Sequence, residues 1–145
     1  MKKTILSLAF GALLVPAVVN AEQLKGLNII MTSGDTQTQM MGMVLSGATL
    51  NVHKKQVNIT LCSEAGKLAL KDFQANEIKK ADGTKVNPKA ALMGLIKGGA
   101  NVTVCPLFLP NVDKDTKALI DGVTVAKPPV VAEGLLSSEY NTLNF

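Results

Sequence analysis

The chain has no arginine and no tryptophan, and it is poor in other side chains that commonly carry recognition or catalysis. Its 145 residues include one Tyr, four Phe, one His and two Cys. Without arginine, the chain lacks the side chain that reads phosphates and base edges in bidentate fashion. The few aromatic residues provide no platform on which bases can stack. These shortages argue against nucleic-acid binding.

The first 21 residues have the pattern of a secretory signal peptide. Two lysines precede an apolar run from Ile5 to Val18, and Val19 and Ala21 fit the small-residue cleavage pattern. The run is shorter than the about 20 apolar residues that span a bilayer, although a retained membrane anchor stays open as the alternative. We therefore expect residues 1–21 to be a cleaved signal and residues 22–145 to form one periplasmic domain of a Gram-negative cell.

Removal of this signal makes the chain nearly neutral. The whole chain has a formal net charge of +4, and loss of two lysines without any acidic residue leaves about +2. A charge this small gives no electrostatic reason for binding nucleic acid or an anionic membrane. No later segment approaches transmembrane length. We expect no membrane association after cleavage.

Apolar, partly β-branched runs alternate with helical patterns along the mature chain. The expected strands are Leu27–Met31, Val57–Cys62, Asn101–Cys105, Val123–Ala126 and Thr142–Phe145. The expected helices are 36–52, 67–73, 88–97, 112–120 and 128–136, with a polar surface connection over 74–86 and an apolar loop over 107–110. This alternation predicts an α/β domain with a mainly parallel sheet of about five strands covered by helices.

The first expected helix is apolar on two faces. One stripe consists of Met41, Val44, Leu45, Ala48 and Val52, and a second consists of Met40, Met43, Gly47 and Leu50. A helix with two apolar faces is either deeply buried or shared with another subunit. We therefore hypothesise an oligomer interface built by Met40, Met43 and Leu50.

Three features fall at the carboxyl ends of expected strands, where ligands and reactive groups gather in open α/β sheets. One is a turn after the first strand, consisting of Thr32, Ser33, Gly34 and Asp35. The others are Cys62, which closes the second strand, and Cys105, which closes the third. Pro106 follows Cys105 directly and bars further ladder bonding there. We take these residues as the candidate site.

The residues alone leave two readings of the cysteines open. An even cysteine count in an oxidising compartment favours a disulfide. If both strands flank the first one, however, the two Cα atoms lie roughly 10 Å apart, beyond the roughly 7 Å that a bridge tolerates. The other reading is a nucleophilic or sulfur-carrying thiol at Cys105, with its thiolate stabilised by amides of helix N-termini. The chain has no Cys-x-x-Cys motif, which disfavours a thioredoxin-like couple.

His53, the only histidine, is expected at the exposed end of the first helix, beside Lys54 and Lys55. A catalytic Cys–His pair would depend wholly on this residue, and a histidine-based zinc site is excluded. The sequence has no glycine-rich nucleotide motif and no serine elbow. We expect neither a cofactor nor a metal site.

The segment from Val86 to Pro110 resembles the DsrE/DsrF-like family of small sulfur-relay proteins. Its helix reaches Gly98-Gly99-Ala100, and an apolar strand then ends at Cys105. The C-terminal segment from Gly122 to Phe145, with a helix and a terminal apolar strand ending in Phe, is also similar to family members. The similarity covers most of the mature chain.

The resemblance implies a flavodoxin-like three-layer fold, assembly into trimers or hexamers, and sulfur donor or acceptor proteins as partners. It also implies that Cys105 matches the thiol that carries a persulfide, whereas Cys62 matches no family cysteine. The best understood members work in the cytoplasm, so an exported member departs from the pattern. The alternative is a non-enzymatic binding or assembly module with a structural disulfide or inert thiols, favoured by the missing general base and the doubly apolar first helix.

Overall fold

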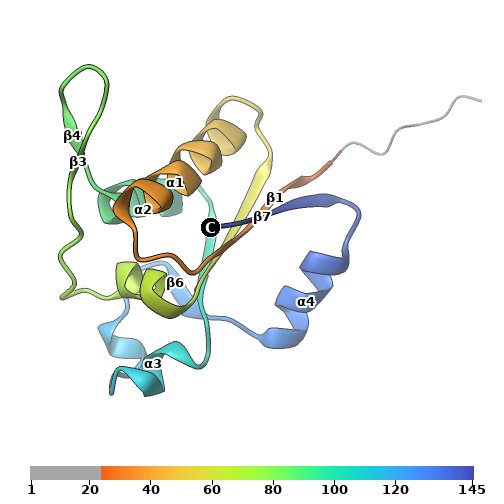
Figure 1. Ribbon diagram of the computed structural model, residues 1–145. Coiled ribbons are helices and arrows are strands. Elements are labelled where there is room, and N and C mark those ends of the chain that lie inside the picture. Colours follow the sequence, from red (N-terminus) through yellow and green to blue (C-terminus); the bar gives the residue numbers. More distant parts are fainter. Residues whose placement is uncertain (1–23) are drawn as a thin grey trace, which may run out of the picture.

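The computed structural model describes residues 24–145, which form a five-stranded parallel sheet with helices on both sides (Figure 1). The strands are β1 (Gly26–Met31), β2 (Gln56–Leu61), β5 (Asn101–Val104), β6 (Val123–Val125) and β7 (Tyr140–Asn144). Their order across the sheet is β6-β5-β2-β1-β7. The expected α/β fold with a parallel sheet is therefore confirmed. The expected signal peptide lies outside the described residues.

Four α-helices and two short 3₁₀ helices connect these strands within the described part of the chain. They are α1 (Thr36–Asn51), η1 (Ser63–Ala69), α2 (Pro88–Lys97), α3 (Phe108–Asn111), η2 (Thr116–Ala118) and α4 (Pro128–Leu136). The two longest begin where capping chemistry predicts, because Asp35 accepts a hydrogen bond from the Thr38 amide and Asn87 accepts one from the Ala90 amide, each at 2.8 Å. No helix of residues 24–145 is long and apolar enough to cross a membrane.

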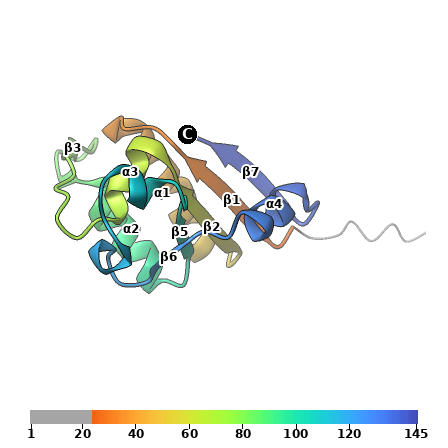
Figure 2. The same cartoon turned by 90° about the horizontal axis from the view of Figure 1, so that it is seen from below.

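The order of the strands decides which face each helix covers. The chain lays down β1, β2, β5 and β6 in one direction across the sheet, and then returns to place β7 beside β1. Right-handed crossovers put the connections of the first four strands on one face and the returning connection on the other. Figure 2 shows this arrangement, with α1, α2 and α3 on one side of the sheet and α4 on the other. One face is thus well covered and the other has a single short helix.

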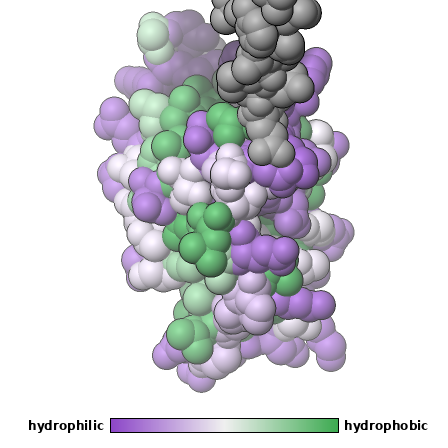
Figure 3. All heavy atoms as spheres, turned by 90° about the vertical axis from the view of Figure 1, so that its right-hand side faces the viewer, coloured by the Kyte–Doolittle hydropathy of each residue, from purple (hydrophilic) through white to green (hydrophobic). Residues whose placement is uncertain are grey.

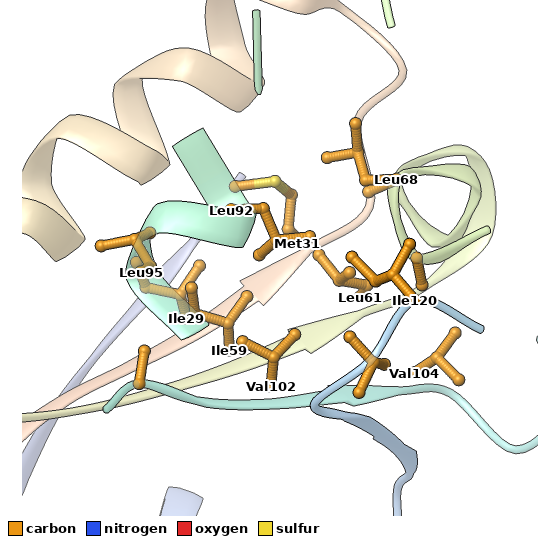
Figure 4. Packing of buried hydrophobic residues seen from close by; sticks show 14 of the residues in the cluster. Ile29, Met31, Ile59, Leu61, Leu68, Leu92, Leu95, Val102, Val104 and Ile120 are labelled. Atoms are coloured by element: carbon orange, nitrogen blue, oxygen red, sulfur yellow. The ribbon is translucent and has the colours of Figure 1, made fainter. Parts of the chain in front are cut away.

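The covered face holds the hydrophobic core. Side chains alternate along a strand, so every second residue of β1, β2 and β5 points toward the helices. Figure 4 shows the resulting layer, which consists of Ile29, Met31, Ile59, Leu61, Val102 and Val104 from the strands and Leu68, Leu92, Leu95 and Ile120 from the covering segments. The sheet residues among them are at most 1% exposed, so they fix the position of the strands.

The opposite face of the same strands is polar. Asn58 donates to the Asn28 side chain at 3.0 Å, and Asn101 donates to the Asn58 side chain at 3.3 Å. Asn28 in turn donates to the Gly134 carbonyl of α4 at 2.9 Å. Strands of a parallel sheet are usually apolar on both faces. This face of the sheet therefore has hydrogen-bonded amide side chains where a parallel sheet usually has apolar ones.

Two of the expected helices are wrong. Instead of a helix over 67–73, the 3₁₀ helix η1 starts at Ser63 and ends before Leu70, which pairs with Leu119 in an isolated bridge. Instead of a helix over 112–120, the chain turns at Asp113, whose φ of 51° interrupts a right-handed helix, and only η2 follows.

Two of the expected connections contain regular structure. The apolar segment 107–110 leads into the one-turn helix α3. The polar connection 74–86 contains a small hairpin of β3 (Ile78–Lys79) and β4 (Lys85–Val86). The strands are too short to be recognised by alternation, since each has two residues.

One apolar face of α1 is buried in the domain and the other is exposed. Met40 and Met43 are 8% and 3% exposed and lie inside the domain, so the hypothesis that they form an oligomer interface is wrong. Leu50 packs partly buried against the core. The other stripe faces outward, with Met41 53% and Val44 58% exposed. The stripe of Met41 and Val44 is therefore the apolar face of α1 that is open to a partner.

Candidate functional site

The two cysteines lie side by side at the carboxyl edge of the sheet. β2 and β5 are neighbours, and their register ends with Leu61 opposite Val104. The next residues are Cys62 and Cys105, and the Cys105 amide still donates to the Leu61 carbonyl at 2.8 Å. The premise that both strands flank the first one is therefore wrong. The relevant distance is one strand spacing of about 4.8 Å, which falls within the Cα separation of disulfides.

Both thiols are free and half-buried. The pKa of Cys62 is raised to about 11, first by burial, then by the negative charge that Cys105 carries when ionised, and by a side-chain hydrogen bond with Cys105. The two thiols are thus close enough for one to influence the ionisation of the other. Cys62 keeps its proton at neutral pH, so it is not the thiol that starts a reaction there.

The turn that follows β1 lies next to the thiols, but its polar side chains are hydrogen-bonded to the backbone. The Cys62 amide donates to the Met31 carbonyl, so Thr32 comes next to Cys62 at the sheet edge. Thr32 donates its hydroxyl to the Phe145 carbonyl at 2.9 Å, and the Ser33 hydroxyl accepts from the Asp35 amide at 3.1 Å. The hydrogen bond from the Thr38 amide lowers the pKa of Asp35. The turn therefore supports the site rather than reacting in it.

Gly34 lets this turn approach the segment after Cys62. A Cβ at Gly34 would lie 3.0 Å from the Glu64 Cβ, which is tighter than an ordinary contact. Glu64 forms an exposed ion pair with Lys67 at 2.5 Å. Ser63 has a φ of 51°, a conformation that few non-glycine residues adopt. The chain thus leaves the sheet sharply at Cys62.

The segments that follow the two cysteines pack closely against each other. A Cβ on Gly66 of η1 would lie 2.5 Å from the ring of Phe108, which begins α3. The Gly66 amide donates to the Cys62 carbonyl at 3.3 Å, and the Phe108 amide donates to the Cys105 carbonyl at 2.9 Å. These two amides therefore bond to backbone carbonyls rather than to a thiol. Pro106, which has no amide hydrogen, ends the pairing of β5.

His53 lies at the opposite edge of the sheet. It follows α1 and precedes β2, and it is exposed. The six residues of β2 separate it from Cys62, a distance of about 20 Å at the rise of a strand. A Cys–His pair is therefore excluded. Among the described residues, no group of three or more His, Cys, Asp or Glu is arranged to hold a metal.

A cavity of about 310 Å³ lies on the polar face between the sheet and α4. Its lining includes Asn58 and Asn101 and the next pair, Thr60 and Thr103, whose hydroxyls are 3.2 Å apart. The following pair in the same register is Cys62 and Cys105, and alternation assigns it to the same face. The cavity therefore ends one residue pair from the thiols. The sequence did not reveal it, because it depends on the strand order.

Lys89 is a half-buried cation whose role was not apparent from the sequence. Its ammonium donates to the carbonyls of Leu70, Lys71 and Phe73 at 2.6, 3.0 and 2.7 Å. Burial lowers its pKa, while the nearby Asp72 opposes this effect. With all three donors used by backbone carbonyls, Lys89 clamps the loop after η1 and is a structural residue.

Comparisons with known proteins identify the fold. No protein-family model matches the chain, and no curated protein matches it by sequence. Among solved structures, the ychN protein from E. coli superposes with a TM-score of 0.62 at 20% identity, covering 83% of this chain and 99% of the other. MTH1491 from Methanobacterium thermoautotrophicum, described as a protein of unknown function, gives 0.58 at 12% identity, covering 82% and 96%. At these identities the likeness concerns the fold, and it supports the DsrE-like fold implied by the resemblance.

Proposed function

We propose that this chain is a periplasmic sulfur carrier that holds a persulfide on Cys105. The observation that carries the proposal is the position of Cys105, half-buried at the carboxyl edge of a DsrE-like sheet and two residues beyond Thr103, which lines the cavity. The adjacent Cys62 keeps its proton at neutral pH, which leaves Cys105 as the thiol that takes up sulfur. Export rests on the signal pattern of residues 1–21.

The chemistry needs no metal, cofactor or general base of the chain. The Cys105 thiolate attacks the outer sulfur of a donor persulfide R–S–SH, so that a new S–S bond forms and the donor's S–S bond breaks. The leaving donor sulfur takes the proton of the donor persulfide and departs as the thiol R–SH, and Cys105 carries the outer sulfur as a deprotonated persulfide. A half-buried position suits this product because it limits hydrolysis and oxidation while leaving one side open to a donor or acceptor protein.

Cys105→Ser should abolish sulfur uptake. Incubation of the reduced wild-type chain with glutathione persulfide, followed by rapid removal of the donor and immediate intact-mass measurement, should show a gain of one sulfur atom, about 32 Da, mapped to Cys105. The Cys105→Ser chain should show none. A matched control is Thr103→Ser, which keeps the hydroxyl on the neighbouring residue pair and should load normally. A free Cys105 that takes up no sulfur would contradict the proposal and favour the non-enzymatic binding module.

We also propose that the chain self-associates through its exposed apolar helices. Val44 on α1 is 58% exposed, and α4 has no buried residue, with Val130 60% and Leu136 87% exposed. Figure 3 shows hydrophobic residues gathered on the face of the molecule on which α4 lies. Exposed apolar patches of this kind mark association surfaces in soluble proteins. Trimers or hexamers are the assemblies that the family resemblance favours.

Val44→Glu should shift the chain toward the monomer. A charge in the middle of an apolar contact has to be desolvated on association, which weakens the contact by several kcal/mol. Light scattering at micromolar concentration measures the change, and Ala81→Glu, an exposed position between β3 and β4 and outside α1, is the control. A wild-type chain that is already monomeric under these conditions would refute self-association.

A further inference from the structure

The side chains of β2 and β5 meet in successive pairs that end at the thiols. Asn58 meets Asn101, Thr60 meets Thr103, and both pairs are hydrogen-bonded. Cys62 and Cys105 are the next residues after the last pair of the register, Leu61 and Val104. The strands remain hydrogen-bonded up to the Cys105 amide. The sheet itself therefore holds the two cysteines one strand spacing apart.

This proximity has a chemical consequence once Cys105 carries a persulfide. The Cys105 sulfur, which lies on the strand next to Cys62, becomes the inner sulfur of the persulfide. Attack by a neighbouring thiol on the inner sulfur gives a disulfide and expels the outer sulfur. One strand spacing is a separation that a disulfide accepts, so bridging requires no movement of the strands.

We propose that Cys62 is a resolving thiol, which releases the sulfur carried by Cys105 as hydrogen sulfide and leaves a Cys62–Cys105 disulfide. This inference rests on the proposed function. The Cys62 thiol, which holds its proton until the persulfide is next to it, passes this proton to the outer sulfur as the Cys62 sulfur attacks the Cys105 sulfur. The S–S bond of the persulfide breaks, and the outer sulfur leaves as HS⁻, the conjugate base of H₂S. The outer sulfur is reduced to sulfide while the two cysteines are oxidised to a disulfide, so no external oxidant takes part. A dithiol reductant then restores both thiols.

The test compares the wild-type chain with Cys62→Ser under anaerobic conditions. Both are reduced, loaded with glutathione persulfide, freed of the donor, and followed by intact mass, peptide mapping and sulfide assay. The wild-type chain should lose the added sulfur, release one sulfide per chain, and yield linked Cys62 and Cys105 peptides. The persulfide on Cys62→Ser should last at least ~100-fold longer, because it lacks the intramolecular attacker. Dithiothreitol should reset the wild-type chain for a second round.

The outcomes separate this inference from the proposed function. If Cys62→Ser takes up no sulfur at Cys105 and the wild-type chain takes up none either, the proposed function fails and the resolving role with it. If both chains load but the wild-type chain keeps its sulfur as long as the variant and forms no disulfide, only the resolving role fails. Peptide mapping of the wild-type chain decides the question even if Cys62→Ser does not fold.

Discussion

Gly66→Val should destabilise the domain by about 3 kcal/mol, although it changes neither cysteine. The first added carbon would lie 2.5 Å from the ring of Phe108, and two further ring atoms would lie 2.7 Å away. Phe108 is 7% exposed and belongs to the hydrophobic core, so it cannot move into solvent without losing buried area. The ring or the 3₁₀ helix η1 must therefore shift. Urea unfolding followed by circular dichroism measures the loss.

The same substitution should also slow the release of sulfur. Gly66 belongs to the segment after Cys62 and Phe108 to the segment after Cys105, so a shift at their contact would disturb the ends of the strands that hold the two thiols side by side. Gly94→Val is the matched control, because a Cβ on this exposed glycine of α2 meets no atom within 4 Å. It should leave the free energy of unfolding within about 0.5 kcal/mol of the wild type. A Gly66→Val chain as stable as this control would contradict the prediction, because it would mean that the Phe108 ring moves aside at little cost in free energy.

The sequence predicted the sheet better than its connections. The strands were recognisable because their residues are apolar and β-branched in short runs, and α1 and α2 were recognisable from Asp35, Asn87 and Pro88. The segments over 63–73 and 107–120 were misjudged because their structure depends on tertiary contacts. Gly66 packs on Phe108, Leu70 pairs with Leu119, and Asp113 takes a left-handed conformation. None of these contacts has a local sequence pattern.

The sequence identified the two cysteines of the candidate site but did not predict that they are neighbours. The carboxyl ends of the strands pointed to Cys62 and Cys105, and the structure confirms that both lie there. Their adjacency depends on the order of the strands, and hydrophobic patterning does not state which strands are neighbours. With β2 between β1 and β5, the two cysteines are one strand apart rather than two. This difference turns a pair of separate thiols into a pair that can react with each other.

Bridging Cys62 and Cys105 should raise the free energy of unfolding by roughly 2–4 kcal/mol. The bridge closes a long loop, which lowers the entropy of the unfolded chain, and the sheet already holds both residues one strand spacing apart. Urea unfolding of the wild-type chain, once with the disulfide formed and once in dithiothreitol, measures the difference. Cys62→Ser should unfold at the same urea concentration in both conditions. An oxidised wild-type chain less stable than the reduced one would mean that bridging strains the sheet edge, and the disulfide would then be unsuited to the resting state of a resolving pair.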